Sequence, residues 1–102
     1  MTSAFELLAD PTRRRVLDEL RQGESSVGML AERLNMNQPA ISKQLRVLRE
    51  AGLASVQVDA QRRIYRLNPE GLREIDDWLA PYREKWEERL NAMERTLDSM
   101  ED

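Results

Sequence analysis

The fold is decided by residues 37–52, which read NQPAISKQLRVLREAG. Asn37 is a good helix N-cap, and the proline two residues later is tolerated in the first turn of a helix. Ile41, Leu45 and Leu48 recur at intervals of four and three residues, which is the pattern of one buried helical stripe. The final glycine is a typical stop signal. The stretch therefore predicts an amphipathic helix with one apolar face and one polar face.

The polar face of this helix carries the residues of chemical interest. When each residue advances the helix by about 100°, Ser42, Lys43 and Arg46 share the side opposite the apolar stripe. Gln44 lies near the edge of the buried side. Gln38 stands at the start of the helix.

Two further helices are expected upstream. Asp10 and Pro11 form a start signal, because Asp is a good N-cap and Pro in the first helical position loses no needed N–H. Gly23 ends this helix, and Ser26 can cap the next one. Residues 3–9 could add one or two helical turns. The side chains expected to point inward are Val16, Leu17 and Leu20 on the first helix and Met29, Leu30 and Leu34 on the second.

Downstream of residue 52 the pattern changes from helical to alternating. Residues 53–58 alternate apolar and polar side chains, and residues 63–67 contain the β-formers Ile and Tyr. Residues 59–62 link these strands, which predicts a short hairpin with Arg62 and Arg63 at its tip. The order of helix, helix, turn, helix and hairpin predicts a winged helix-turn-helix, a mainly α fold with a small β-hairpin.

A last, long helix is expected to begin at Asn68 or Pro69. Its apolar residues follow a seven-residue repeat that shifts midway, which fits helix packing in a bundle better than a regular coiled coil. Pro81 should kink or split this helix near residues 77–81, because proline removes one helical hydrogen bond. The apolar residues of the stripe are Leu72, Ile75, Leu79, Tyr82, Trp86, Leu90, Met93, Leu97 and Met100.

The charge is divided unevenly along the chain. The 16 Lys and Arg residues and 19 Asp and Glu residues give a formal net charge of -3, which by itself argues against nucleic acid. Residues 1–66, however, contain eleven basic and eight acidic residues, whereas residues 67–102 contain five and eleven. A basic first part is therefore joined to an acidic C-terminal segment. The alternative interpretation is two ordinary solvated surfaces.

The sequence contains neither Cys nor His. This excludes disulfides, thiolate or imidazole metal ligands, a Cys nucleophile and a Ser-His dyad. The sequence contains no run of 18 apolar residues, so we expect no transmembrane helix. The first residues lack the features of a signal peptide. We therefore expect a cytoplasmic protein that is not an enzyme, with no catalytic residues, no metal site and no cofactor.

Three stretches resemble ArsR-family transcriptional regulators, in the right order and over nearly the whole chain. They are LLADPTRR at residues 7–14, QPAISKQLRVLREAGL at residues 38–53 and RRIYRL at residues 62–67. The resemblance implies a homodimeric winged helix-turn-helix repressor whose terminal helices form the dimer interface. Founding members sense arsenite or divalent metals through Cys, or through His with acids. Those ligands are absent here, so the sequence is more similar to a metal-free branch of the family.

The resemblance and the side-chain chemistry together assign candidate DNA contacts. Lys and Arg side chains neutralise phosphates, whereas Gln and Ser can hydrogen-bond to base edges in the major groove. The expected phosphate contacts are Lys43, Arg46, Arg62 and Arg63, and the expected base contacts are Gln38, Ser42 and Gln44. A solvated helix face is the alternative, and for Gln44 its poor helical angle leaves both possibilities open. Arg13, Arg14 and Arg15 could steady the DNA backbone, or form surface ion pairs with Asp18 or Glu19.

The domain is divided into a winged helix-turn-helix core at residues 1–68 and a dimerisation helix at residues 69–102. The expected dimer contacts are Leu72, Ile75, Leu79, Tyr82, Trp86, Leu90, Met93 and Leu97. Trp78, Tyr82 and Trp86 are spaced four residues apart, so they could instead line a pocket for a small-molecule effector; a dimer seam is favoured.

The leading hypothesis is a homodimeric repressor that binds double-stranded DNA. It would bind a pseudo-palindromic operator through the helix at residues 38–50 and the wing at residues 59–63. The alternative is a protein-interaction module that uses its C-terminal helix and has no need of a basic face.

Overall fold

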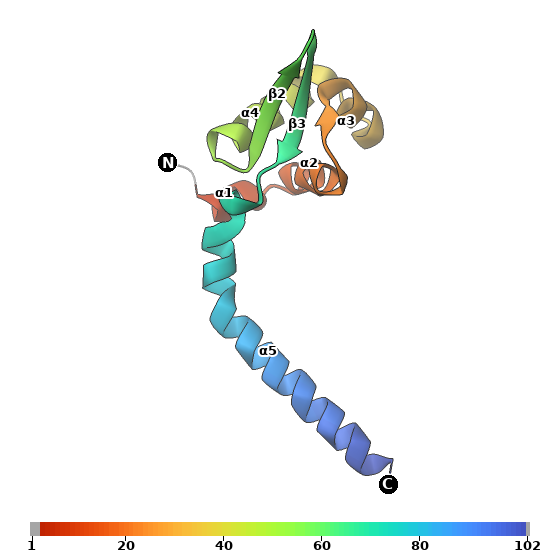
Figure 1. The fold of residues 1–102 in the computed structure, drawn as a ribbon, viewed down its shortest axis with the longest axis vertical. Helices are drawn as coiled ribbons and strands as arrows, with labels where there is room; N and C mark the ends of the chain where they lie inside the picture. The colour runs from red at the N-terminus through yellow and green to blue at the C-terminus, as the bar shows by residue number, and fades with distance from the viewer. Residues whose placement is uncertain (1–2, 102) are drawn as a thin grey trace.

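The computed structural model describes residues 3–101 and consists of a small head from which one long helix extends (Figure 1). The fold is the predicted winged helix-turn-helix, mostly helical with a three-stranded antiparallel sheet. The head contains α1 (Ala4–Leu8), α2 (Pro11–Gln22), β1 (Ser25–Ser26), α3 (Val27–Leu34), α4 (Gln38–Glu50), β2 (Ala54–Asp59) and β3 (Arg62–Leu67). A 3-10 turn, η1 (Pro69–Leu72), leads into α5 (Arg73–Met100).

The three helices of the helix-turn-helix region begin at the caps predicted from the sequence. Asp10 Oδ1 accepts a hydrogen bond from Thr12 N at 2.9 Å, Ser26 Oγ from Met29 N at 3.3 Å, and Asn37 Oδ1 from Ala40 N at 2.8 Å. Each such cap contributes about 1 kcal/mol, because it satisfies a backbone N–H that has no partner inside the helix. These local signals fix where α2, α3 and α4 start.

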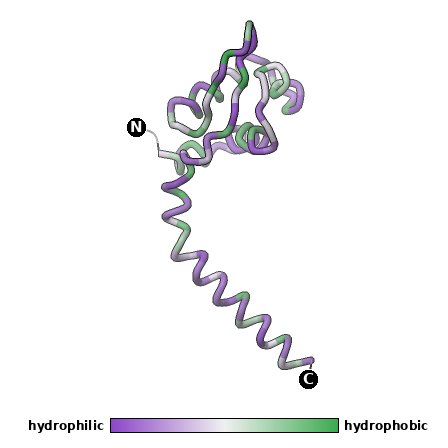
Figure 2. The backbone as a smooth tube through the Cα atoms, viewed as in Figure 1, coloured by the Kyte–Doolittle hydropathy of each residue, from purple (hydrophilic) through white to green (hydrophobic). Residues whose placement is uncertain are grey.

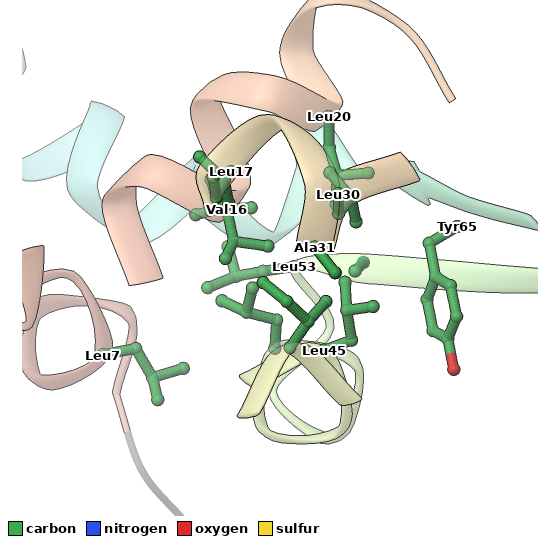
Figure 3. Packing of buried hydrophobic residues seen from close by; sticks show 13 residues of the cluster. Leu7, Val16, Leu17, Leu20, Leu30, Ala31, Leu45, Leu53 and Tyr65 are labelled. Atoms are coloured by element: carbon green, nitrogen blue, oxygen red, sulfur yellow. The ribbon is translucent and has the colours of Figure 1, made fainter. Parts of the chain in front are cut away.

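One apolar core holds the head together (Figure 3). Ile41, Leu45 and Leu48, the predicted stripe of α4, are all 0% exposed. They pack in one cluster with buried residues of α1, α2, α3, β2 and β3. Met29 is an exception to the prediction, since its side chain is 39% exposed. Leu30 and Leu34 are buried as predicted, and Ala31 joins them in the core, which leaves Met29 on the helix flank.

The sheet contains a third strand that the sequence did not predict. β1 has two residues, and Ser25 pairs with Tyr65 and Ser26 with Ile64 on β3. β3 therefore lies between β1 and β2. Ser26 also caps α3, so a segment interpreted only as a helix start is a strand as well.

The wing hairpin is tighter than expected. Asp59 pairs with Arg62, so the turn consists of Ala60 and Gln61 alone. Ala60 has a φ of 57°, in the left-handed region that favours glycine. Each strand is thus one residue longer at the tip than the pattern predicted.

α5 is one continuous helix that contains Pro81. Its axis turns within its first half, so the proline bends the helix and does not split it (Figure 1). Arg83 donates a hydrogen bond to Asp76, a pairing that spans the proline. This bond and the negative charge of Asp76 raise the pKa of the Arg83 guanidinium further above its usual value.

The junction between the head and α5 is closely packed. A Cβ atom on Gly71 would lie 2.8 Å from Leu53 Cδ2 and 2.9 Å from the carbonyl carbon of Gly52, so only glycine fits. Gly52 itself has a φ of 80°. On the other side, Ala4 N of α1 donates to Glu74 Oε1 of α5 at 2.6 Å. These contacts set the direction in which α5 leaves the head.

Candidate nucleic-acid interface

A groove of about 350 Å³ lies between α4 and the wing. Its lining side chains come from three elements: α4, β3 and the start of α3. The lining residues are Val27, Pro39, Ser42, Lys43, Arg46, Arg49, Arg63 and Tyr65. Four of the seven predicted DNA contacts, Ser42, Lys43, Arg46 and Arg63, are therefore brought together on one surface.

The groove is strongly basic. Lys43, Arg46, Arg49 and Arg63 line it, and no acidic residue does. Within residues 3–101, none of these four side chains forms an ion pair with a carboxylate. Their charges are thus available to an anion, and a groove lined by one sign of charge attracts a ligand of the opposite sign.

Arg49 is a candidate that the sequence interpretation missed. It follows Ser42 by seven residues and Arg46 by three, so all three lie on one side of α4. The helical angles could have identified it. Tyr65 also lines the groove, since it follows Arg63 by two residues on β3 and lies on the same face. Val27 lines it too, directly after the strand β1 that pairs with β3, a pairing that no local pattern shows.

Gln38 and Arg62 are exposed at two ends of this surface. Gln38 is the first residue of α4, and its Nε2 lies 3.7 Å from where a Cβ on Gly28 would stand, so it extends over the start of α3. Arg62 lies opposite Asp59 in the strand register at the tip of the wing and does not line the groove. Both positions are on the outside of the head, at the N-terminus of α4 and at the far end of the hairpin.

Gln44 is placed differently from the other six residues. It is half-buried, does not line the groove, and accepts a hydrogen bond at Oε1 from Nε of Arg13 at 3.0 Å. It therefore faces α2, on the flank of α4 away from the wing.

The arginines of α2 do not form the ion pairs suggested with Asp18 or Glu19. Arg13 Nε lies 3.8 Å from Asp10 Oδ2, and Arg14 donates to the Leu8 carbonyl at 2.6 Å. Arg15 donates to the carbonyl of Leu34, the last residue of α3, at 3.5 Å. Two of these arginines thus contact the segment that precedes α2, and the third contacts the end of α3.

The stripe on α5 is exposed along most of its length. Figure 2 shows hydrophobic residues recurring among hydrophilic ones along a helix that extends away from the head. None of the described residues of α5 is buried, and Trp86 is 67% and Met93 61% exposed. Leu72 is half-buried and packs against the core of the head. The remaining predicted dimer contacts, Ile75, Leu79, Tyr82, Leu90 and Leu97, range from half-buried to exposed.

The aromatic residues of α5 are divided into two groups. Trp78 contacts Phe5 of α1 edge-on, with ring centroids 5.8 Å apart, and Tyr82 at 4.8 Å. Trp86 instead borders a hollow with Leu90 and Met93. The sequence spacing suggested one row of three aromatics and missed the contribution of Phe5.

The part of the chain that the structure describes contains neither a metal-ligand cluster nor a membrane-spanning helix. Across residues 3–101, no group of three or more Asp or Glu side chains is arranged to hold a metal ion. No helix within the same residues is both long enough and apolar enough to cross a membrane.

A helix-turn-helix followed by a wing, with a basic groove between them, defines a winged helix-turn-helix DNA-binding protein. The model of the bacterial regulatory proteins of the arsR family matches residues 10–56. The chain is also 33% identical to the transcriptional repressor SdpR of Bacillus subtilis (strain 168), over 88% of this chain and 100% of that protein. The chain belongs to the arsR family. It is a DNA-binding transcriptional regulator, and the family is not one of enzymes.

Solved structures agree with this assignment. A possible transcriptional regulator for arsenical resistance is 39% identical, with a TM-score of 0.73 over 80% of this chain and 85% of that chain. The homodimeric winged helix-turn-helix DNA-binding domain Mb0332 from Mycobacterium bovis, a possible ArsR-family regulator, is 28% identical. It has a TM-score of 0.63 over 78% of this chain and 74% of that chain.

Proposed function

We propose that this protein is a homodimeric repressor that binds a pseudo-palindromic operator. The observation that carries the proposal is the basic groove between α4 and the wing, whose four cationic side chains form no ion pair with a carboxylate among residues 3–101. Each phosphate that such a side chain neutralises releases counterions and strengthens binding. Residues 1–68 would form the DNA-binding core and residues 69–102 the dimerisation segment.

In this proposal α4 is the recognition helix and enters the major groove with its N-terminal part. Gln38 and Ser42, both exposed and near that end, would contact base edges. Lys43, Arg46 and Arg63 would contact phosphates, and Arg62 at the wing tip would contact the adjacent backbone. Arg49 joins the phosphate contacts because it lines the same groove. Phosphate contacts set the register, and base contacts provide the specificity.

Homodimerisation is supported by the surface of α5 and by a relative. The stripe Tyr82, Trp86, Leu90, Met93 and Leu97 exposes apolar area that a partner would cover. The Mycobacterium bovis relative is described as homodimeric. A two-fold dimer would place two recognition helices in successive major grooves, about 34 Å apart. Repression would follow from exclusion of polymerase at the promoter.

The test is selection of DNA from a pool of random duplexes by the full chain. The expected result is enrichment of an inverted repeat, with half-sites about one helical turn apart. The variant K43A with R46A should weaken binding to the selected duplex. It should also reduce the slope of log K against log salt by about two per protomer, because two phosphate contacts are lost.

The control for this test is the oligomeric state, measured by sedimentation, which should not change in the double variant. Unchanged DNA affinity in that variant would contradict the assignment of the groove.

The alternative function is a protein-interaction module that uses α5. The exposed stripe of α5 favours it, since an unrelated protein could cover the same residues. Failure of the wild-type protein to enrich any duplex would support this alternative, because a module of that kind has no use for the basic groove.

A further inference from the structure

A hydrogen bond outside the groove joins α2 to the recognition helix. Arg13, in the first turn of α2, donates from Nε to Gln44 Oε1 in the middle of α4 at 3.0 Å. Asp10 lies behind the arginine, with Oδ2 at 3.8 Å from the same nitrogen. Its other oxygen, Oδ1, caps α2 through Thr12 N. The N-terminus of α2 is therefore connected by side chains to α4.

The geometry of this connection restricts both partners. The side chain of Arg13 is 25% exposed and that of Asp10 34%, so the bond is partly shielded from water. Hydrogen bonds with a charged partner are shorter and stronger than neutral ones. A guanidinium is also planar, with its N–H groups in a fixed arrangement, so the acceptor must lie in a defined direction.

Apolar packing alone does not provide this restriction. Ile41, Leu45 and Leu48 hold α4 against the core, but dispersion contacts have little directional preference, whereas a hydrogen bond weakens steeply as its angle closes. Gln44 directly follows Lys43 and precedes Arg46 by two residues. A small rotation of α4 about its axis would move Lys43, Arg46 and Arg49, the three cations that α4 contributes to the groove, together.

We propose that Arg13 is a positioning residue for DNA recognition. By holding Gln44, it fixes the rotation of α4, so that Ser42, Lys43 and Arg46 meet a duplex in register. In this proposal Gln44 bonds to Arg13 on the α2 side of the helix and does not contact a base edge. The inference rests on the proposed DNA-binding role of the groove.

A positioning role and a direct phosphate contact have different consequences. Loss of a phosphate contact weakens binding to every duplex and lowers the salt slope, because the contact carries no sequence information. Loss of positioning weakens binding to the preferred duplex, since base contacts depend on register. It leaves the affinity for an unrelated duplex and the salt slope unchanged, because a small rotation displaces the base contacts while the long Lys and Arg side chains still reach phosphates.

The experiment compares the full-length wild type with R13A, Q44M and the double variant. Q44M keeps the length of the side chain and removes the acceptor. The probes are the duplex that the wild type selects from a random pool and an unrelated duplex of equal length, each titrated at several salt concentrations. R21A is the matched control, because it removes one positive charge from an exposed position on α2.

Each single variant should weaken binding to the selected duplex about tenfold, which corresponds to one hydrogen bond with a charged partner. The double variant should be no weaker than either single variant, since the same bond is lost in all three. R21A should bind as the wild type does. R13K, which keeps the charge without the planar group, should show the loss of R13A, and circular dichroism should show that each variant is folded.

The inference alone would be overturned by additive losses in the double variant, or by a salt slope shallower by about one per protomer in R13A, which indicates a phosphate contact. An equal loss in R21A would also overturn it, because the effect would be one of charge. If the wild type selects no duplex, the proposed function fails and this inference fails with it.

Discussion

The head and α5 use apolar residues in opposite ways. In the head, Leu30, Ile41 and Leu45 are 0% exposed and belong to a core made by segments distant in sequence. On α5, Trp86, Leu90 and Leu97 are 67%, 47% and 58% exposed. Burial stabilises by about 25 cal/mol for each Å² of apolar surface removed from water. The head gains that free energy within one chain, whereas most of α5 can gain it only against a partner.

This comparison separates two kinds of stability. The free energy of unfolding of the head should depend on its own packing. In the proposed homodimer, the state of α5 should depend on protein concentration, since a second copy would cover the stripe. Substitutions in the head should therefore change the free energy of unfolding, whereas substitutions on α5 should change association, and the two effects should also differ in size.

The largest effect is expected for Leu45→Ala in the head. The side chain is fully buried in the core, so its truncation leaves a cavity and should lower the free energy of unfolding by about 3–5 kcal/mol. Urea denaturation followed by circular dichroism measures this loss, which should be the same at every protein concentration. A loss below about 1 kcal/mol would mean that the core is less closely packed than the structure indicates.

Trp86→Ala should have the next largest effect, and only on association. A central tryptophan at an interface commonly contributes about 2–4 kcal/mol, so the dimer should dissociate at much higher protein concentrations than the wild type. Sedimentation equilibrium measures this shift. The helical signal of the head should not change. If the variant keeps the monomer–dimer equilibrium of the wild type, Trp86 does not lie in a dimer interface. The stripe of α5 would then not be stabilised by association.

The same division explains how much the sequence could predict. Asp10, Ser26 and Asn37 were identified as caps because a cap and its N–H partner lie within three residues of each other. The periodic stripes of α4 and α5 were likewise visible, since a helix face repeats locally. The fold class followed from the order of these local elements.

Features that depend on distant segments were not predicted. The strand Ser25–Ser26 exists because Tyr65 and Ile64 are brought beside it, and two residues are too few to show a strand pattern. The bond from Arg13 to Gln44 joins residues 31 positions apart. Arg49 is a different case, because its helical angle alone places it with Ser42 on the exposed face of α4.

Gly71→Ala tests the junction between the two regions. The added Cβ would meet the backbone of Gly52 and the side chain of Leu53, so the start of α5 must shift away from the head. Strain of this kind costs about 1–3 kcal/mol, measured as a lower free energy of thermal unfolding. Gly23→Ala is the matched control, because a Cβ there meets nothing within 4 Å. Equal effects of the two substitutions would show that the junction is not tightly packed.

The smallest expected effect has the opposite sign and lies at the tip of the wing. Ala60 has a φ of 57°, and the left-handed conformation costs a residue with a Cβ about 1–2 kcal/mol. Ala60→Gly removes that strain, but glycine loses about 0.5–1 kcal/mol more through its greater freedom in the unfolded chain. The balance should stabilise the head by about 0.5 kcal/mol, seen as a small rise in Tm. Gln61→Gly, at the neighbouring turn position without a positive φ, should lower Tm, because it adds the same freedom and relieves no strain. If Ala60→Gly lowers Tm as well, the turn does not hold Ala60 in the left-handed region, and the wing is less constrained than the rest of the head.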